Sequence, residues 1–180
     1  RFMPVLRNGL LVQLNLVWFI AMTAFVMVDS AIALFLKDVF SFGELGLGWY
    51  FLFVGAIIVL VQGGAVGRLS RLIGERALCA IGLLTVAAGC LITAGAAWWP
   101  LLTLLMTGGA IHAIGRSLLQ PSISAMVSRN SAQDMQGTSL GLYQGIGTLG
   151  RVVGPIVAGL AYARHVTLPW MVSSALLLGA

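Results

Sequence analysis

Long apolar runs dominate this chain and restrict what it can fold into. The runs lie at residues 9–36, 46–67, 77–97, 101–127, 137–161 and 169–180. The first five are each long enough to cross a bilayer core of about 30 Å as an α-helix. Charged residues make up only 8% of the 180, whereas soluble domains carry about a quarter. The sequence therefore predicts an all-α, polytopic membrane helix bundle whose surroundings are a lipid bilayer.

The ends of the chain set an expectation about its extent. It begins at Arg1 and ends at Ala180, within an apolar run shorter than the roughly 20 residues that a spanning helix needs. We therefore expect a single transmembrane domain, residues 1–180, that is a fragment of a longer protein and is truncated at both ends.

Basic residues indicate how the helices are oriented. With a cytoplasmic N-terminus, the outer connections carry Lys37 and Arg164, and the inner ones carry Arg1, Arg7, Arg68, Arg71, Arg76 and Arg129. This asymmetry follows the positive-inside rule. It also accounts for the net charge of +5 without a nucleic-acid partner. Tryptophan and tyrosine gather at the outer ends as an interfacial belt would, with Trp18 as an exception. We expect a multi-pass protein of the bacterial inner membrane.

Polar side chains inside the expected helices are costly in lipid and are by default functional candidates. Two stripes recur at helical spacing, one of His112, Arg116, Gln120 and Ser124 and one of Gln144, Thr148 and Arg151. Residues at such spacing share one face of a helix, and that face must contact protein or water. Asn15 and Asp29 lie about 40° apart around the first helix. The sequence predicts a substrate or coupling cavity lined by Asn15, Asp29, His112, Arg116, Gln120, Gln144 and Arg151.

Other roles for these residues stay open at this point. Each arginine could satisfy backbone carbonyls and fasten helices together, and His112 alone would be a packing histidine. Asp29 is expected close to the outer interface, where water can hydrate it. Because two arginines share one intramembrane carboxylate, we expect an anionic substrate or the remainder of the protein to supply a partner.

Neither the cysteines nor a glycine motif indicates a cofactor or metal. Cys79 and Cys90 lack metal-ligand spacing and are interpreted as small buried side chains. Gly145, Gly147 and Gly150 have the spacing of a dinucleotide-binding turn, but they lie inside an apolar run with no acidic residue after Asp134. We expect instead that Gly147, Gly150 and Gly154 allow a neighbouring helix to approach closely, and that Pro155 bends the helix.

The stretch "QGGAVGRLSRLIGERALCAIG", residues 62–82, resembles the loop between the second and third helices of each half of the major facilitator superfamily. Gly67, Leu69, Gly74 and Arg76 match that motif, G-x-L-x-D-R-x-G-R-R. Arg71 stands at its aspartate, Leu72 at its first arginine and Glu75 at a basic position. These departures are similar to the C-terminal copy of the motif. The resemblance therefore does not imply that Arg71 closes the salt-bridged gate that the aspartate of the N-terminal copy closes. Gly67, Arg68, Arg71, Gly74, Glu75 and Arg76 are the expected cytoplasmic motif residues.

Two further stretches support the same resemblance. "GTLGRVVGPIVAGLAY" is similar to a helix of the drug:proton antiporters of this superfamily, with Gly150, Gly154, Pro155 and Gly159 in matching places. The first helix, with Asp29 ahead of "ALFLKDVF", is similar to that of tetracycline-exporter-like members.

The resemblance implies the C-terminal half of a twelve-helix secondary transporter, not an enzyme. It implies export of a small-molecule substrate coupled to protons, with the substrate between the two halves and alternating access by rocking. Residues 68–76 would contact helix ends and bias one state, or would merely retain positive charge inside. The alternatives are a non-transporting membrane sensor of the same fold and an intramembrane enzyme that uses His112 and Asp29.

Overall fold

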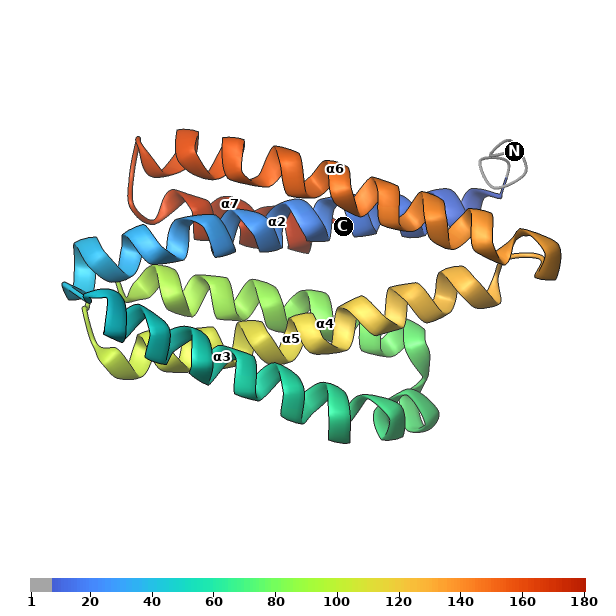
Figure 1. Cartoon of the computed structure of the whole chain (residues 1–180), viewed down its shortest axis with the longest axis horizontal. Helices are drawn as coiled ribbons and strands as arrows, with labels where there is room; N and C mark the ends of the chain where they lie inside the picture. Colours follow the sequence, from blue (N-terminus) through green and yellow to red (C-terminus); the bar gives the residue numbers. More distant parts are fainter. Residues whose placement is uncertain (1–7) are drawn as a thin grey trace.

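The computed structural model describes residues 8–180 as an elongated bundle of helices (Figure 1). Arg1 and Arg7, two of the expected cytoplasmic arginines, lie outside the described residues. Within the described part, five helices are long and apolar enough to cross a membrane. The helices are α2 (Gly9–Phe40), α3 (Glu44–Gly64), α4 (Val66–Gly95), α5 (Leu102–Arg129), α6 (Gln136–Tyr162) and α7 (Leu168–Leu178), with a 3-10 turn η1 (Gln133–Met135) before α6. The all-α prediction is confirmed.

The expected third helix, 77–97, begins eleven residues earlier than predicted, at Val66. The connection 68–76, expected as a loop, is helical on both sides of one break at Gly74, where φ is 81° and ψ is 161°. That backbone conformation is available almost only to glycine. Residues 66–73 therefore form a short helical segment that turns away from the rest of α4, and the sequence interpretation of a plain loop was wrong. The other helices begin and end within four residues of the expected positions.

Replacing Gly74 with alanine should destabilise the protein by about 1–3 kcal/mol, because a Cβ is strained at this φ and ψ. The matched control is Gly67→Ala on the other side of the break, where a Cβ meets nothing within 4 Å. Thermal unfolding in detergent should show a lower midpoint for Gly74→Ala only. Equal midpoints for the two variants would contradict the strained break.

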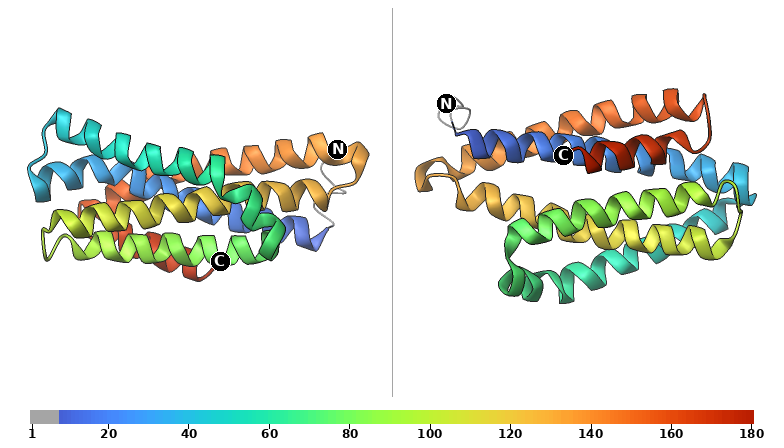
Figure 2. Two further views of the ribbon diagram at one scale, coloured as in Figure 1. Left: turned by 90° about the horizontal axis from the view of Figure 1, so that it is seen from below. Right: turned by 180° about the vertical axis from the view of Figure 1, so that it is seen from behind.

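The helices associate as two close pairs, α2 with α6 and α4 with α5. α7 packs against both α2 and α4 and so touches both pairs. α3 lies along α5 (Figure 2). It buries Tyr50 and leaves its other side chains partly or fully exposed. Trp18, the exception to the aromatic belt, stacks on Tyr143 of α6 with ring centroids 4.6 Å apart.

Glycines hold α6 against α2. A Cβ at Gly150 would lie 2.9 Å from Met22 Cβ and 3.1 Å from the carbonyl oxygen of Phe19. Gly147 and Gly154 face α2 in the same way, whereas a Cβ at Gly145 would meet nothing within 4 Å. The pattern that mimics a nucleotide-binding turn is thus part of a helix interface, and α6 continues through Pro155 as one helix.

A second glycine interface joins α4 to α5, and the sequence interpretation missed it. A Cβ at Gly89 would lie 2.5 Å from the backbone nitrogen of His112 and 2.9 Å from the carbonyl oxygen of Gly108. A Cβ at Gly115 would lie 2.6 Å from the backbone nitrogen of Val86. Here the obstacles include backbone atoms, so the two helix axes are as close as their main chains allow.

Candidate functional site

An ion pair joins α2 to α5. Arg116 Nη1 donates to Asp29 Oδ2 at 2.8 Å, and the two side chains are 27% and 45% exposed respectively. The sequence interpretation counted one intramembrane carboxylate for two arginines and did not say which arginine it pairs with. The packing of α2 beside α5 brings Asp29 to Arg116, although the two residues are 87 positions apart.

Aromatic side chains hold the arginine from a second direction. The guanidinium carbon of Arg116 lies 5.2 Å from the centre of the Phe25 ring, within the range of a cation–π interaction. Phe25 in turn meets the His112 ring edge-on, with centroids 6.0 Å apart. Arg116 therefore has a carboxylate and an aromatic face as partners, and only the carboxylate can change its charge.

A cavity of about 400 Å³, the ion-pair cavity, opens beside this pair. It is lined by Val28, Asp29, Ile32, Tyr50, Phe51, Val54, Gly55, Ile58, Thr93, Gly109, His112, Arg116 and Trp170. Its wall is mostly apolar with a few convergent polar groups, which is the usual composition of a small-molecule site. The structure thus brings together Asp29, His112 and Arg116 of the predicted site.

His112 lies both in a helix interface and at the ion-pair cavity. Its backbone lies in the tight interface with Gly89, and its ring lines the ion-pair cavity. Nδ1 lies 3.6 Å from Cys90 Sγ, and among the described residues Nε2 is buried without a hydrogen-bond partner. Cys79 and Cys90 are both buried and unpaired. No group of three or more potential metal ligands forms within residues 8–180.

The polar stripe of α5 divides between two cavities. Gln120 lines a second cavity of about 280 Å³, the amide cavity, with Gln62, Val66, Pro121, Ser124, Tyr143 and Gln144. The Tyr143 hydroxyl donates to the carbonyl oxygen of Gln120 at 3.4 Å. Two of the predicted residues, Gln120 of α5 and Gln144 of α6, therefore line the same cavity, to which α3 and α4 also contribute.

Asn15 does not join Asp29. It lines an apolar groove of about 300 Å³ between α2 and α6, and its Nδ2 donates to the carbonyl oxygen of Leu11 at 2.7 Å. The helical angle between Asn15 and Asp29 is small, but a separation of 14 residues corresponds to about 21 Å along the axis. The two side chains therefore lie at different depths, and they face different helices, α6 for Asn15 and α5 for Asp29.

Arg151 is exposed on α6, on the face that carries Gln144 and Thr148. Thr148 Oγ1 donates to the carbonyl oxygen of Gln144 at 3.0 Å. Among residues 8–180, Arg151 has no ion-pair partner. It lies apart from the wall of the ion-pair cavity.

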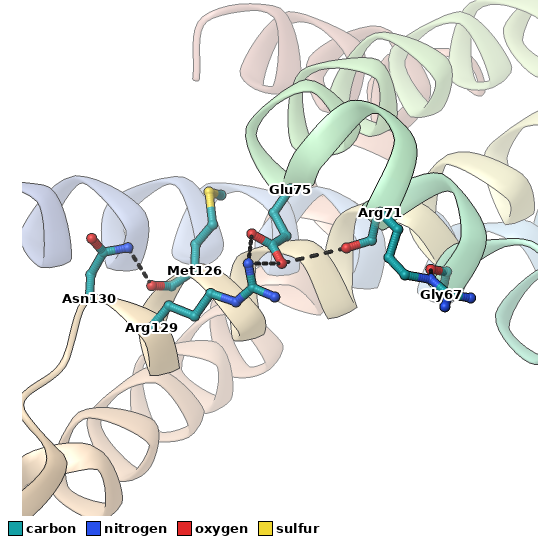
Figure 3. Close-up of polar contacts among 7 residues, drawn as sticks. Gly67, Arg71, Glu75, Met126, Arg129 and Asn130 are labelled. Atoms are coloured by element: carbon teal, nitrogen blue, oxygen red, sulfur yellow. Dashed lines mark hydrogen bonds and ion pairs between the residues drawn. The ribbon is translucent and has the colours of Figure 1, made fainter.

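The expected cytoplasmic motif forms its own polar cluster (Figure 3). Glu75 pairs with Arg129 at the end of α5, with Oε1 and Nη1 3.0 Å apart, while Arg71 donates to the carbonyl oxygen of Gly67 on its own helix at 3.1 Å. Figure 3 shows the Arg129 guanidinium directed at the Glu75 carboxylate. The ionic contact of this motif is thus made by Glu75, one of the positions where the chain departs from the family pattern. Arg68, Arg71 and Arg76 are exposed.

Tyr50, Thr93 and Trp170 are among the wall residues of the ion-pair cavity that were not predicted from the sequence. Tyr50 was assigned to the interfacial belt, yet it is 6% exposed and its hydroxyl packs over Gly109. Thr93 and Trp170 come from α4 and α7, and neither forms part of a polar stripe. The sequence contains one weak indication of Thr93 and Tyr50 at this site, the pair Gly108–Gly109, which leaves space for the side chains of neighbouring helices.

Comparison with known proteins agrees with this architecture. The family model "Major Facilitator Superfamily" matches residues 14–180. Major facilitator superfamily domain-containing protein 10 of Mus musculus is 31% identical over 157 residues, which cover 87% of this chain and 33% of that protein. The class E tetracycline resistance protein of Escherichia coli is 29% identical over 133 residues, 68% of this chain and 31% of that protein.

A solved structure has the same fold. The crystal structure of the human organic anion transporter MFSD10 (TETRAN) superposes with a TM-score of 0.84 at 24% identity, over 93% of this chain and 39% of the human one. This chain therefore spans about a third of the length of the curated relatives that it matches. Mammalian relatives are prominent among the matches, so the comparisons give no support to the expected bacterial inner membrane. The fold, the membrane-length helices and the family model together show that the chain belongs to the major facilitator superfamily.

Proposed function

We propose that this chain forms the C-terminal half of a proton-coupled secondary transporter that exports small organic molecules by alternating access. The observation that carries the proposal is the Asp29–Arg116 ion pair at the wall of a cavity of about 400 Å³, inside helices of membrane length. Ionisable side chains inside a membrane domain are energetically costly, so their presence there favours a functional role.

The roles of the polar residues follow from their positions. Asp29 is the group that carries the proton, and Arg116 and Arg151 attract the cargo, with His112 beside the ion pair. The human structure is that of an organic anion transporter, and two arginines with one carboxylate also favour anions among the candidate cargoes. Similarity to a tetracycline resistance protein favours export.

The ends of the bundle support a proposed orientation. Arg68, Arg71 and Arg76 lie near the start of α4 and Arg129 ends α5, and both positions are at one end of the bundle (Figure 1). The connections at the opposite end contain Arg164, with Lys37 in the last turn of α2. The positive-inside rule makes the first end cytoplasmic. We propose that the exposed polar face of α6, with Arg151, is directed toward the N-terminal half of the full-length protein.

Transport by the full-length protein in proteoliposomes tests this function. Candidate anions such as 1-naphthoate are loaded, and flux is measured with an imposed pH gradient and after its collapse by an ionophore. Gradient-dependent flux is expected, and Arg151→Gln should reduce it at least tenfold. Arg164→Gln is the matched control, because it removes a basic residue from a connection outside the helices.

The alternatives give different results in the same system. Flux that is unchanged when the gradient collapses would contradict proton coupling. A sensor of the same fold would bind cargo but move none across the membrane. An intramembrane enzyme would convert the compound, which chromatography of the recovered cargo would detect.

A further inference from the structure

We infer that the short helix before the Gly74 break, residues 66–73, forms together with Arg76 a docking surface for anionic phospholipids, in the cytoplasmic leaflet of the proposed orientation. Its arginines bind the headgroup phosphates, while Leu72 and Ile73 contact the acyl chains. This lipid surface goes beyond the proposed transport function and does not depend on it. It uses only the proposed orientation and the proposed placement of the N-terminal half against α6.

The lengths of the flanking helices place the lipid surface at a boundary of the bilayer core. α3 has 21 residues, which correspond to about 31 Å at a rise of 1.5 Å per residue. Residues 75–95, the part of α4 after the break, form a helix of the same length. Since the core of a bilayer is about 30 Å thick, each of these segments crosses it once. The short helix between them therefore lies at the level of the lipid headgroups.

The arginines of this surface have no ion-pair partner among the described residues. Arg68 and Arg76 are exposed, and Arg71 uses its Nε to donate to a carbonyl oxygen of its own helix at 3.1 Å. The neighbouring acid, Glu75, is already paired with Arg129, and Figure 3 shows the Arg71 guanidinium directed away from that pair. Guanidinium groups bind phosphate oxygens through two parallel N–H donors. The lipid surface thus offers free cations to an anionic headgroup.

Two apolar side chains accompany these cations. Leu72 is 79% exposed and Ile73 is 45% exposed. Leu72 follows Arg68 by four residues, so the two side chains are neighbours on one face of the short helix. Basic and apolar side chains side by side are typical of helices that lie in a membrane interface, where the apolar groups enter the acyl region and the charges meet the headgroups. A soluble anion would leave Leu72 and Ile73 in water, so the combination favours a lipid.

The packing of α4 directs the lipid surface away from the proposed partner half. α4 packs on α5 and α7, whereas α6, whose polar face we assign to the N-terminal half, packs mainly on α2. α4 and α6 lie apart in both views of Figure 2. The short helix belongs to α4, so its exposed side faces the surroundings of the bundle. An acidic segment of the N-terminal half is the competing occupant.

Native mass spectrometry of the full-length protein in detergent tests the binding. The protein is titrated with phosphatidylglycerol or with phosphatidylcholine of the same acyl chains. We expect phosphatidylglycerol to bind more tightly, and each substitution Arg68→Gln, Arg71→Gln or Arg76→Gln to weaken it about fivefold, because a basic residue near an anionic membrane contributes about that factor. Arg164→Gln at the opposite end is the matched control and should bind as the unmodified protein does. Equal binding of the two lipids by the unmodified protein would overturn the inference without any variant.

Hydrogen exchange of the full-length protein in lipid nanodiscs locates the site. Backbone amides of residues 66–76 should exchange more slowly when the nanodiscs contain phosphatidylglycerol than when they contain phosphatidylcholine alone. The connection between α6 and α7 should exchange equally in both. The triple variant Arg68→Gln/Arg71→Gln/Arg76→Gln should lose the difference at residues 66–76. Protection that persists in this variant, or that arises only elsewhere in the protein, would contradict the assignment.

Two further measurements separate a lipid from the other occupants. Leu72→Ser should weaken both lipids and keep the preference for phosphatidylglycerol, and soluble glycerol phosphate should not displace that lipid. Displacement by glycerol phosphate would show a site for free anions. If the triple variant unfolds at a lower temperature without lipid, and phosphatidylglycerol leaves exchange at residues 66–76 unchanged, the occupant is an acidic segment of the protein; either result overturns the inference. No cargo or pH gradient is used, so a protein that binds the lipid here but shows no gradient-driven flux would contradict the proposed function alone.

Discussion

Arg116→Gln should lower the free energy of unfolding by about 1–3 kcal/mol, because it leaves the Asp29 carboxylate at the cavity wall without its cation. Breaking a fully buried pair costs about 3–5 kcal/mol. Because the Asp29–Arg116 pair is partly exposed, we expect a smaller loss than for a fully buried pair. The double variant Asp29→Asn/Arg116→Gln should recover most of the loss, since no unpaired charge remains.

A double-mutant cycle measures this coupling directly. Unfolding of the unmodified protein, the two single variants and the double variant is followed in one detergent. A coupling energy of about 1–2 kcal/mol is expected for a contact of this kind. Losses that add without coupling would contradict a direct Asp29–Arg116 contact. The control is the same double-mutant cycle with Asp29 and Arg151, because these two side chains do not contact each other.

Gly89→Ala should also destabilise the protein, because its Cβ would lie 2.5 Å from the backbone nitrogen of His112. α4 and α5 must then separate, and overpacking of this kind costs about 1–3 kcal/mol. The same movement displaces His112 and opens the ion-pair cavity, so anion binding should weaken as well. Thermal unfolding and binding of 1-naphthoate check the two effects.

The matched control for Gly89→Ala is Gly95→Ala at the end of the same helix, where an added Cβ meets nothing within 4 Å. It should unfold and bind as the unmodified protein does. If both variants unfold at the same temperature as the unmodified protein, the close approach of α4 to α5 is not present in the folded protein.

Much of the fold was predictable because membrane helices are recognisable in a sequence from the length and apolarity of their segments. The glycines of α6 were also predictable, since Gly147, Gly150 and Gly154 recur at helical spacing within a short stretch. Gly82 and Gly89, like Gly108 and Gly115, are seven residues apart, which is two helical turns. That spacing is present in the sequence, but only the packing of α4 on α5 shows that the glycines of one helix face those of the other.

The candidate site was predictable only in part. His112 and Arg116 share a helix face, so their presence at one cavity follows from spacing alone. The partner of Arg116 lies on another helix, and no periodicity within one helix reveals which helices are neighbours. Asn15 shows the converse limit, because an angle around the helix axis contains no information about depth.

The position of α7 has a consequence for how this half of the protein can deform. α7 touches both close pairs through α2 and α4, while the Asp29–Arg116 bond ties α2 to α5 on the cavity side. A change that breaks this bond would leave the contacts of α7 with α2 and α4, and those of α5 with α6, in place. We therefore expect α7 to act as the main link between the two pairs when the Asp29–Arg116 bond is lost, and the angle between the pairs to change as well as the lining of the cavity.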